Sequence, residues 1–254
     1  MKEKSNNNSN INKNTNIKQI LTLILFVIII FIGIYATNNY NENQNKVDIE
    51  QTISYTLDTV PEYSSQPYVT INSNIPNFQE NDFTTNSFED YSDLDDYGRC
   101  GVAFANLNKE VTMPKENENR KSLEKVIPSG WQDISYPEIK LSNLYNKCHL
   151  IAYSLSAENA NDKNIITGTR YFNISGMAPF ENRVRNYLNN NTDKHVLYRV
   201  TPIYEGSNLV ANGVTIEAES VEDRGANICF YVYIYNVQPG VIINYVTGES
   251  KLAE

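Results

Sequence analysis

Apolar and polar positions follow strand-like patterns most clearly in the second half of the chain. Residues 196–204 (VLYRVTPIY), 209–220 (LVANGVTIEAES) and 228–237 (ICFYVYIYNV) are rich in Val, Ile and Tyr, as β-strands are. Residues 98–107 (GRCGVAFANL) fit another strand, and residues 149–156 (HLIAYSLS) fit a strand or the start of a helix.

One segment has the period of a helix. In PFENRVRNYLNNN, residues 179–191, the apolar side chains at positions 180, 184, 187 and 188 share one face, and Pro179 suits a first turn. The preceding stretch ITGTRYFNISG, residues 166–176, is predicted to end in a loop at Gly176. Strands from distant parts of the chain together with a helix indicate an α+β domain with a central antiparallel sheet.

A long apolar run lies near the N-terminus. Residues 20–36 (ILTLILFVIIIFIGIYA) carry no charge, and a helix that crosses a bilayer needs about 20 apolar residues, with a range of roughly 17 to 25. A single transmembrane anchor is favoured over a cleaved signal peptide, whose apolar core is about 7 to 15 residues long. Lysines cluster before the run and only Lys46 follows closely, which predicts a cytoplasmic N-terminus and the bulk of the chain outside.

Composition divides the rest of the chain into three parts. Residues 1–19 form an Asn-rich tail, expected in the cytoplasm. Residues 37–90 are rich in Asn, Ser, Thr, Asp and Glu without a sustained apolar period, which predicts a disordered linker. The folded domain is therefore expected over residues 91–254.

The charge is negative overall but uneven. The 254 residues carry a formal net charge of −9, whereas residues 140–199 contain eight basic and four acidic side chains. The three cysteines, Cys100, Cys148 and Cys229, make no CxxC or zinc-finger spacing. They leave open a disulfide with one spare thiol, or buried small apolar side chains.

Few residues stand out as candidates for chemistry. The chain has no GxSxG, P-loop, GxGxxG or HExxH motif and only two histidines, His149 and His195. A histidine inside an apolar strand is by itself more often structural than catalytic. Lys147 shares a face with His149 if the segment is extended, and a cation beside a histidine suits an anionic substrate.

Several blocks together carry a family resemblance. They are YSDLDDYGRCGVAFANL, MPKENENR, IPSGW, LYNKCHLIAYSL, ENANDKNIITGTRYFNISGMAPFENRVRNYL, HVLYRVTPIYEG and ICFYVYIYNVQPGVIINYVTGES, in that order over residues 91–250. In these blocks the chain resembles DNA/RNA non-specific endonucleases of the ββα-metal (His-Me finger) type. It is similar in particular to the DNA-entry and streptococcal-type nucleases of Gram-positive bacteria. The family motif Asp-Arg-Gly-His reads Asn146, Lys147, Cys148 and His149 here.

The resemblance implies a set of catalytic residues. His149 corresponds to the general base that activates water against phosphorus. Asn173 corresponds to the protein ligand of one divalent cation, usually Mg²⁺, with Mn²⁺ as a substitute. Glu181 resembles the helix glutamate that orients water at the cation. Arg120 resembles an arginine that stabilises charge in the transition state, with the neighbouring Lys121 as the alternative.

The same resemblance implies contacts to the substrate. Lys147 stands where the family has a phosphate-contacting arginine, and lysine keeps the charge but not the bidentate geometry. Arg185, one helical turn after Glu181, is expected to contact phosphate, with a surface pair to Glu181 as the alternative. Asn164 resembles a second active-site asparagine at the substrate side, expected to position groups rather than to bind metal.

The predicted function is a membrane-anchored, extracytoplasmic, Mg²⁺-dependent nuclease that hydrolyses DNA and RNA without sequence specificity. Its expected location is the bacterial cell membrane, or the medium if residues 20–36 are cleaved. DNA uptake, with the uptake machinery as partner, or nucleic-acid scavenging would be its role. The alternative is an inactive surface DNA-binding module of the same fold. A toxin-like nuclease is a third class, which the anchor argues against.

Overall fold

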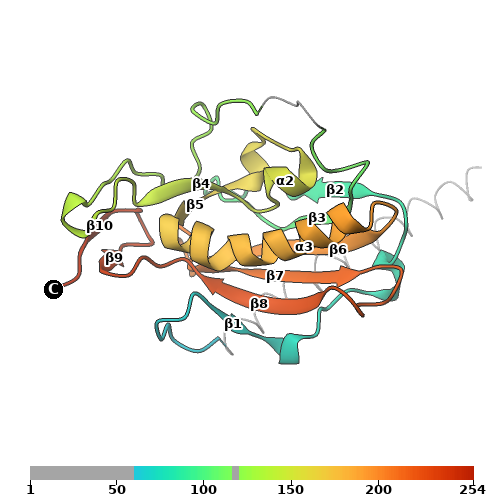
Figure 1. The fold of residues 1–254 in the computed structure, drawn as a ribbon. Helices are drawn as coiled ribbons and strands as arrows, with labels where there is room; N and C mark the ends of the chain where they lie inside the picture. The colour runs from blue at the N-terminus through green and yellow to red at the C-terminus, as the bar shows by residue number, and fades with distance from the viewer. Residues whose placement is uncertain (1–59, 116–119) are drawn as a thin grey trace, which may run out of the picture. The chain divides into compact units, whose positions relative to one another are not determined.

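The centre of the molecule is an antiparallel β-sheet in a computed structural model that describes residues 60–115 and 120–254 (Figure 1). The sheet has six strands in the order β1-β8-β7-β6-β3-β2. Their bounds are Tyr68–Thr70 (β1), Phe88–Tyr91 (β2), Ala103–Asn108 (β3), His195–Ile203 (β6), Gly213–Ser220 (β7) and Cys229–Tyr235 (β8). The four strands predicted from residues 98–107, 196–204, 209–220 and 228–237 are thus confirmed as β3, β6, β7 and β8.

One face of this sheet forms the main hydrophobic core. Alternate residues of β3, β6, β7 and β8 point into it, and on β6 these are Val196, Tyr198 and Val200. The register pairs Val200 with Ile216 of β7 and with Ala103 of β3, so the inward sets of neighbouring strands coincide. This alternation is the two-residue period from which the strands were predicted.

A ββα unit packs against the core face. Strands β4 (Tyr145–His149) and β5 (Ile165–Thr169) form a two-stranded antiparallel ribbon. The π-helix η5 (Phe172–Met177) and the helix α3 (Ala178–Asn190) follow directly, and α3 crosses the sheet in Figure 1. The α+β class with a central antiparallel sheet is therefore confirmed, as is the helix predicted over residues 179–191.

The remaining elements are short. They are η1 (Asn72–Asn74), η2 (Glu80–Asp82), η3 (Pro137–Ile139), α2 (Tyr153–Ser156), η4 (Asp162–Asn164), β9 (Val241–Ile243) and β10 (Ser250–Leu252). Residues 149–156, for which a strand or a helix start was expected, contain the end of β4 and then α2. All three cysteines are free thiols, and Cys100 and Cys148 are buried.

A buried amide attaches the ribbon to the sheet. Asn236, just beyond β8, is fully buried, and its Oδ1 accepts a hydrogen bond from the Thr169 backbone N–H at 2.9 Å. Its Nδ2 donates to the carbonyls of Thr167 (3.0 Å) and Ala211 (2.9 Å). One side chain thereby satisfies three backbone groups that would otherwise be buried without partners.

The predicted loop ending at Gly176 is wrong, because residues 172–177 form η5 and continue into α3. Phe172 and Met177 are fully buried, and Thr169 Oγ1 accepts the first free N–H of η5, that of Phe172, at 2.9 Å. Gly176 lies directly against Ile234, where a Cβ atom would overlap the Ile234 side chain. Tertiary packing therefore stabilises a helix whose Asn, Ser and Gly content favours a loop.

The disordered linker predicted over residues 37–90 is wrong from residue 60 onward, as is a folded domain that begins at residue 91. Strands β1 and β2 form the two edges of the sheet, and the chain between them covers its second face. The Asn77 N–H donates to Glu217 Oε2 at 2.6 Å, and the Phe78 ring stacks on Phe104 with centroids 5.8 Å apart. The segment is ordered by bonds to distant strands, which its own composition does not reveal.

The other N-terminal predictions lie outside the described residues. They are the tail over residues 1–19, the apolar span over residues 20–36 and the part of the linker over residues 37–59. Within residues 60–115 and 120–254, no helix combines the length and apolar character that a membrane crossing requires.

An ion pair lies under the N-terminal segment on the second face of the sheet. Arg199 Nε of β6 donates to Glu217 Oε1 of β7 at 2.6 Å, and the Glu217 side chain is only 4% exposed. The Arg199 guanidinium also lies beside two aromatic rings that stack on each other, 4.9 Å from the Phe78 centroid and 5.1 Å from the Phe104 centroid. The pair therefore joins the sheet to the segment that covers it.

Replacing Arg199 by Met is expected to lower the free energy of unfolding by about 3 kcal/mol, because it leaves the Glu217 carboxylate buried without its cation. Urea unfolding followed by circular dichroism measures the change. Arg224→Met is the matched control, because Arg224 pairs with Glu80 at the surface and its loss should leave stability nearly unchanged. Equal effects of the two substitutions would contradict the role given to the buried pair.

Candidate active site

His149 is the last residue of β4 and is buried, with 7% of its surface exposed. Its Nε2 lies 2.8 Å from the backbone carbonyl oxygen of Asn159. A carbonyl can only accept, so Nε2 carries the proton and Nδ1 of the neutral ring holds a free lone pair. The fold thus fixes one tautomer, whose Nδ1 can act as a base.

The surroundings of His149 favour its neutral form. Burial lowers the pKa of the imidazole, and the Arg120 cation lowers it further, while the hydrogen bond to Asn159 opposes the shift. The resulting pKa lies below the ordinary value of 6.5. The ring is therefore unprotonated near pH 7, as a general base must be.

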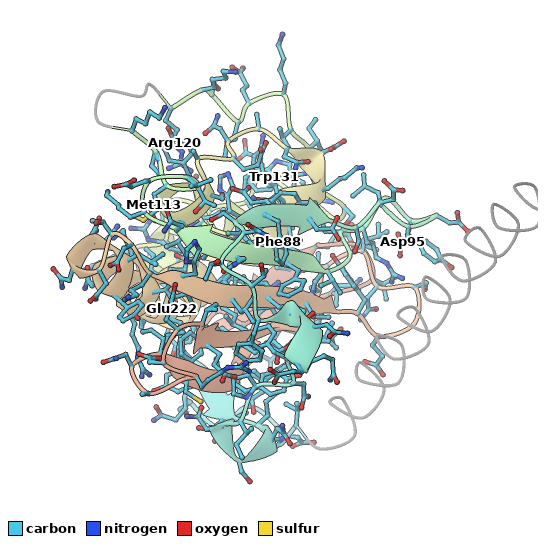
Figure 2. All side chains as sticks on the ribbon, turned by 90° about the vertical axis from the view of Figure 1, so that its right-hand side faces the viewer. Phe88, Asp95, Met113, Arg120, Trp131 and Glu222 are labelled. Atoms are coloured by element: carbon cyan, nitrogen blue, oxygen red, sulfur yellow. The ribbon has the colours of Figure 1, made fainter. Side chains whose placement is uncertain are left out.

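Arg120 lies near His149 on an exposed loop, on the β2 side of the molecule and away from the β1 edge (Figure 2). Its guanidinium carbon is 5.3 Å from the centroid of the Tyr153 ring, which belongs to α2, four residues after His149. Arg120 has no hydrogen bond or ion pair to any other described residue. Its charge is thus available to an anion beside the histidine.

Lys147 does not point into open space. Its Nζ donates to the backbone carbonyls of Leu123 (2.8 Å) and Glu124 (3.0 Å) and lies 5.2 Å from the centroid of the Trp131 ring. The ammonium group expected at a phosphate is therefore bound to the loop that carries Arg120.

Asn164, for which a positioning role at the substrate side was expected, is hydrogen-bonded within the protein. Its side chain is fully buried, Oδ1 accepts from the Ile151 N–H at 2.9 Å, and Nδ2 donates to the Ile151 carbonyl at 3.0 Å. Its backbone carbonyl also accepts from the Leu150 N–H at 2.8 Å. These bonds hold the chain immediately after His149 and leave no accessible atom for a substrate.

A second group of predicted residues lies along η5 and α3. Burial raises the pKa of Glu181, in the first turn of α3, to about 7, although the nearby Arg185 cation opposes the shift. The Asn173 side chain and the Glu181 carboxylate make no hydrogen bond or ion pair with any described residue. An amide oxygen and a partly buried carboxylate without partners are therefore available to a ligand.

The π-helix changes the directions in which the Asn173 and Glu181 side chains point relative to each other. In a regular α-helix, positions eight residues apart such as 173 and 181 are rotated by about 80° relative to each other. The wider π turn rotates less per residue, which reduces this offset. Arg185, four residues after Glu181, shares the face of Glu181.

The donor set fits a divalent cation that keeps most of its water. No group of three His, Cys, Asp or Glu side chains suitable for a metal occurs in the part of the chain that the structure describes. Asn173 and Glu181 offer only oxygen atoms, and a hard cation such as Mg²⁺ prefers oxygen and binds through few protein ligands. Zinc sites of the structural type need more nitrogen or sulfur ligands.

The two groups are close but not bonded to each other. Among the described residues, no hydrogen bond or ion pair links His149 to Asn173 or Glu181. Cys148, the neighbour of His149, lies within electrostatic reach of Glu181, because this carboxylate adds to the burial that raises the pKa of the thiol. The structure thus brings His149 and Arg120 together, with Glu181 and Arg185 on the adjoining helix.

Sequence reasoning missed Asn159 and Tyr153. Asn159 provides the carbonyl that fixes the His149 tautomer, and Tyr153 provides the ring beside Arg120. Asn159 is one asparagine in the polar stretch ENANDKN, and no motif or spacing distinguishes it.

Comparison with known proteins gives consistent matches. The family model for DNA/RNA non-specific endonucleases matches residues 77–222. A deoxyribonuclease from Streptococcus dysgalactiae subsp. equisimilis is 28% identical in an alignment 206 residues long, which covers 65% of this chain and 62% of that protein. The chain thus accounts for less than two thirds of the length of this relative.

Solved structures match over most of the described fold. NucA from Streptococcus agalactiae with magnesium bound is 26% identical with a TM-score of 0.66, over 80% of this chain and 95% of that one. The Sda1 nuclease with bound zinc is 24% identical with a TM-score of 0.61, over 74% of this chain and 97% of that one, and shows the shared fold.

Replacing Arg120 by Met is expected to raise the pKa of His149, because a cation that disfavours the imidazolium is removed. Histidine NMR signals followed over pH measure this directly, since the chain has only two histidines and His149→Ala assigns them. In the unmodified protein the pKa should lie below 6.5. A value that Arg120→Met leaves unchanged would show that the guanidinium is not close to the ring.

Proposed function

The chain belongs to the DNA/RNA non-specific endonuclease family, and from this premise we propose that it is a metal-dependent hydrolase of phosphodiester bonds in DNA and RNA. The observation that carries the proposal is the state of His149. Its Nε2 is bonded to a backbone carbonyl, its Nδ1 lone pair is free, and burial keeps the ring neutral. A base with these properties beside an unpaired arginine is suited to activating water against an anionic phosphate.

In the proposed reaction, His149 Nδ1 removes a proton from the attacking water. The water oxygen then forms a bond to phosphorus while the bond to the leaving 3′ oxygen breaks, and that oxygen takes a proton from solvent. Arg120 stabilises the negative charge that develops on the non-bridging oxygens. Asn164 and the Asn159 carbonyl keep the histidine in place throughout.

Asn173 is the residue proposed to bind the divalent cation, which we take to be Mg²⁺, and Glu181 is proposed to orient a water at that cation. When bound, the cation supplies positive charge to the phosphate and the leaving oxygen. Because burial raises the pKa of Glu181 to about 7, this carboxyl group is half protonated near neutral pH without metal. Cation affinity should therefore increase as pH rises through about 7, since ionised Glu181 is the form that attracts the cation and accepts a hydrogen bond from its water.

Backbone contacts are sufficient for such a reaction, so little sequence preference is expected. Arg185 shares the face of Glu181 and is proposed to contact the substrate phosphates. Lys147, held by loop carbonyls, is the weaker candidate for a direct contact.

The cellular setting is proposed from the N-terminal sequence. The apolar run over residues 20–36, with lysines before it, supports a single-pass membrane anchor and a catalytic domain outside the cell. DNA uptake, with the uptake machinery as partner, or the scavenging of nucleic acid would be the corresponding role. Membrane fractionation of the full chain, compared with a variant that carries charges in this run, tests the anchor.

Replacing His149 or Asn173 by Ala is expected to reduce cleavage of supercoiled plasmid and of RNA by at least about 100-fold, because each removes the base or the cation ligand. Agarose-gel assays with Mg²⁺ and with EDTA measure this. Asn186→Ala is the matched control, because Asn186 is exposed on α3 away from the face of Glu181.

Full activity of Asn173→Ala would sink the metal assignment. A folded, unmodified protein that binds DNA but never cleaves it would favour a surface DNA-binding module instead.

Substrate binding is expected to weaken steeply with salt, because basic side chains that contact phosphates displace condensed counterions. The KM for a short duplex should rise severalfold between about 50 and 200 mM NaCl. Initial rates at constant Mg²⁺ give the slope of log KM against log salt. A slope near zero would be incompatible with phosphate contacts.

A further inference from the structure

We propose that Lys147 and Asn159 are positioning residues that hold the loop over residues 120–125 against the His149 site, and thereby place Arg120 beside the reacting phosphate. This inference rests on the proposed function, in which Arg120 acts on the phosphate. It assigns to Lys147 a contact within the protein in place of a contact to substrate.

The first observation is that the Lys147 ammonium is already used. It has three N–H donors, two of which reach the carbonyl oxygens of Leu123 and Glu124 at 2.8 and 3.0 Å. The face of Trp131 lies 5.2 Å away and stabilises the remaining positive charge. A phosphate at this lysine would have to displace its hydrogen-bond partners, whereas Arg120 has no hydrogen-bond partner to displace among the described residues.

The second observation is that Asn159 connects the base with the loop. Its backbone carbonyl accepts from His149 Nε2 at 2.8 Å, and its side-chain Nδ2 donates to the Lys121 carbonyl at 2.8 Å. The Lys121 carbonyl that accepts this bond belongs to the residue directly after Arg120 in the chain. Loss of this hydrogen bond would let Arg120 move relative to the His149 imidazole.

The third observation is a buried acceptor atom that lowers stability. Asn159 Oδ1 is buried without a hydrogen-bond partner in the described structure. A half-satisfied buried amide disfavours stability, so its presence requires another explanation. Placing the loop beside the base provides one.

Among the described residues, the loop has no other hydrogen bonds to the rest of the fold. Within residues 120–126 its own hydrogen bonds run from the Glu124 N–H to Ser122 Oγ at 3.1 Å and from the Val126 N–H to the Leu123 carbonyl at 3.1 Å. Both are local and neither reaches the ribbon. In the part of the chain that the structure describes, the hydrogen bonds that join the loop to the rest of the fold come from Lys147 of β4 and from Asn159, which follows α2.

The test uses Lys147→Met and Asn159→Ala in the full chain, alone and combined with Arg120→Met. Each single substitution is expected to lower kcat about 10- to 100-fold with little change in KM, because a misplaced catalytic group mainly affects the transition state. In the Arg120→Met background the same substitutions should change kcat by less than about twofold, since they act through Arg120. Losses that simply add would overturn the proposal.

Two further variants separate positioning from other roles. Lys147→Arg keeps donors and charge and should restore most of kcat, whereas Lys251→Met, which removes an exposed lysine of β10, serves as the control. If Lys147 instead contacts phosphate, Lys147→Met will raise KM and reduce the slope of log KM against log salt by about one. That result would also overturn the proposal.

Measurements without substrate or metal keep the test independent of nuclease activity. Loss of either contact should speed cleavage after Lys121 by a lysine-specific protease and shift the His149 NMR titration toward that of Arg120→Met. If the unmodified protein proves inactive, the proposed function fails while these readouts still decide whether the contacts hold the loop. Unchanged proteolysis and titration in both variants would refute the positioning role.

Discussion

The arrangement of the candidate active site depends on the buried amide of Asn236. It follows β8 of the main sheet directly and bonds to β5 at Thr167 and Thr169 and to Ala211, two residues before β7, so it fixes the ribbon relative to the core. Thr169 continues the chain of contacts, because its hydroxyl donates to the Val237 carbonyl and accepts from the first N–H of η5. The elements that carry Asn173 and Glu181, η5 and α3, are therefore joined to the sheet through these two side chains as well as by packing.

The fold leaves less free positive charge near the site than the sequence suggests. Several cations near the site in sequence are neutralised in the fold, since Lys163 pairs with Asp93, Lys194 with Asp193, and Arg199 with Glu217. Arg120 and Arg185 have no such partner among the described residues. The sequence count of eight basic side chains over residues 140–199 therefore overstates the charge available to a polyanion. A turnover enzyme also needs no tight ground-state binding, because catalysis depends on stabilising the transition state.

Local patterns predicted the elements that local interactions determine. Strands β6 and β8 have strongly β-favouring residues in alternation, and α3 has an apolar face with Pro179 in its first turn. His149, Asn173 and Glu181 were identified through the family resemblance and not through periodicity. The failures share a cause, which is bonding to partners distant in sequence. Residues 60–90 are ordered by contacts such as Asn77 to Glu217, and Asn159 acquires its place through single bonds to His149 and Lys121.

The hydrogen bond between His149 and the Asn159 carbonyl also restricts how the base would be regenerated in the proposed reaction. After Nδ1 has taken a proton in the proposed reaction, the ring is a cation with both nitrogens protonated. The carbonyl at Nε2 has no capacity to accept that proton and pass it on, so relay through the ring to the protein interior is blocked. The proton must leave from Nδ1, by the side on which the substrate lay. Departure of the product and recovery of the base are thereby ordered events, because the cleaved phosphate has to uncover the ring before solvent can reset it.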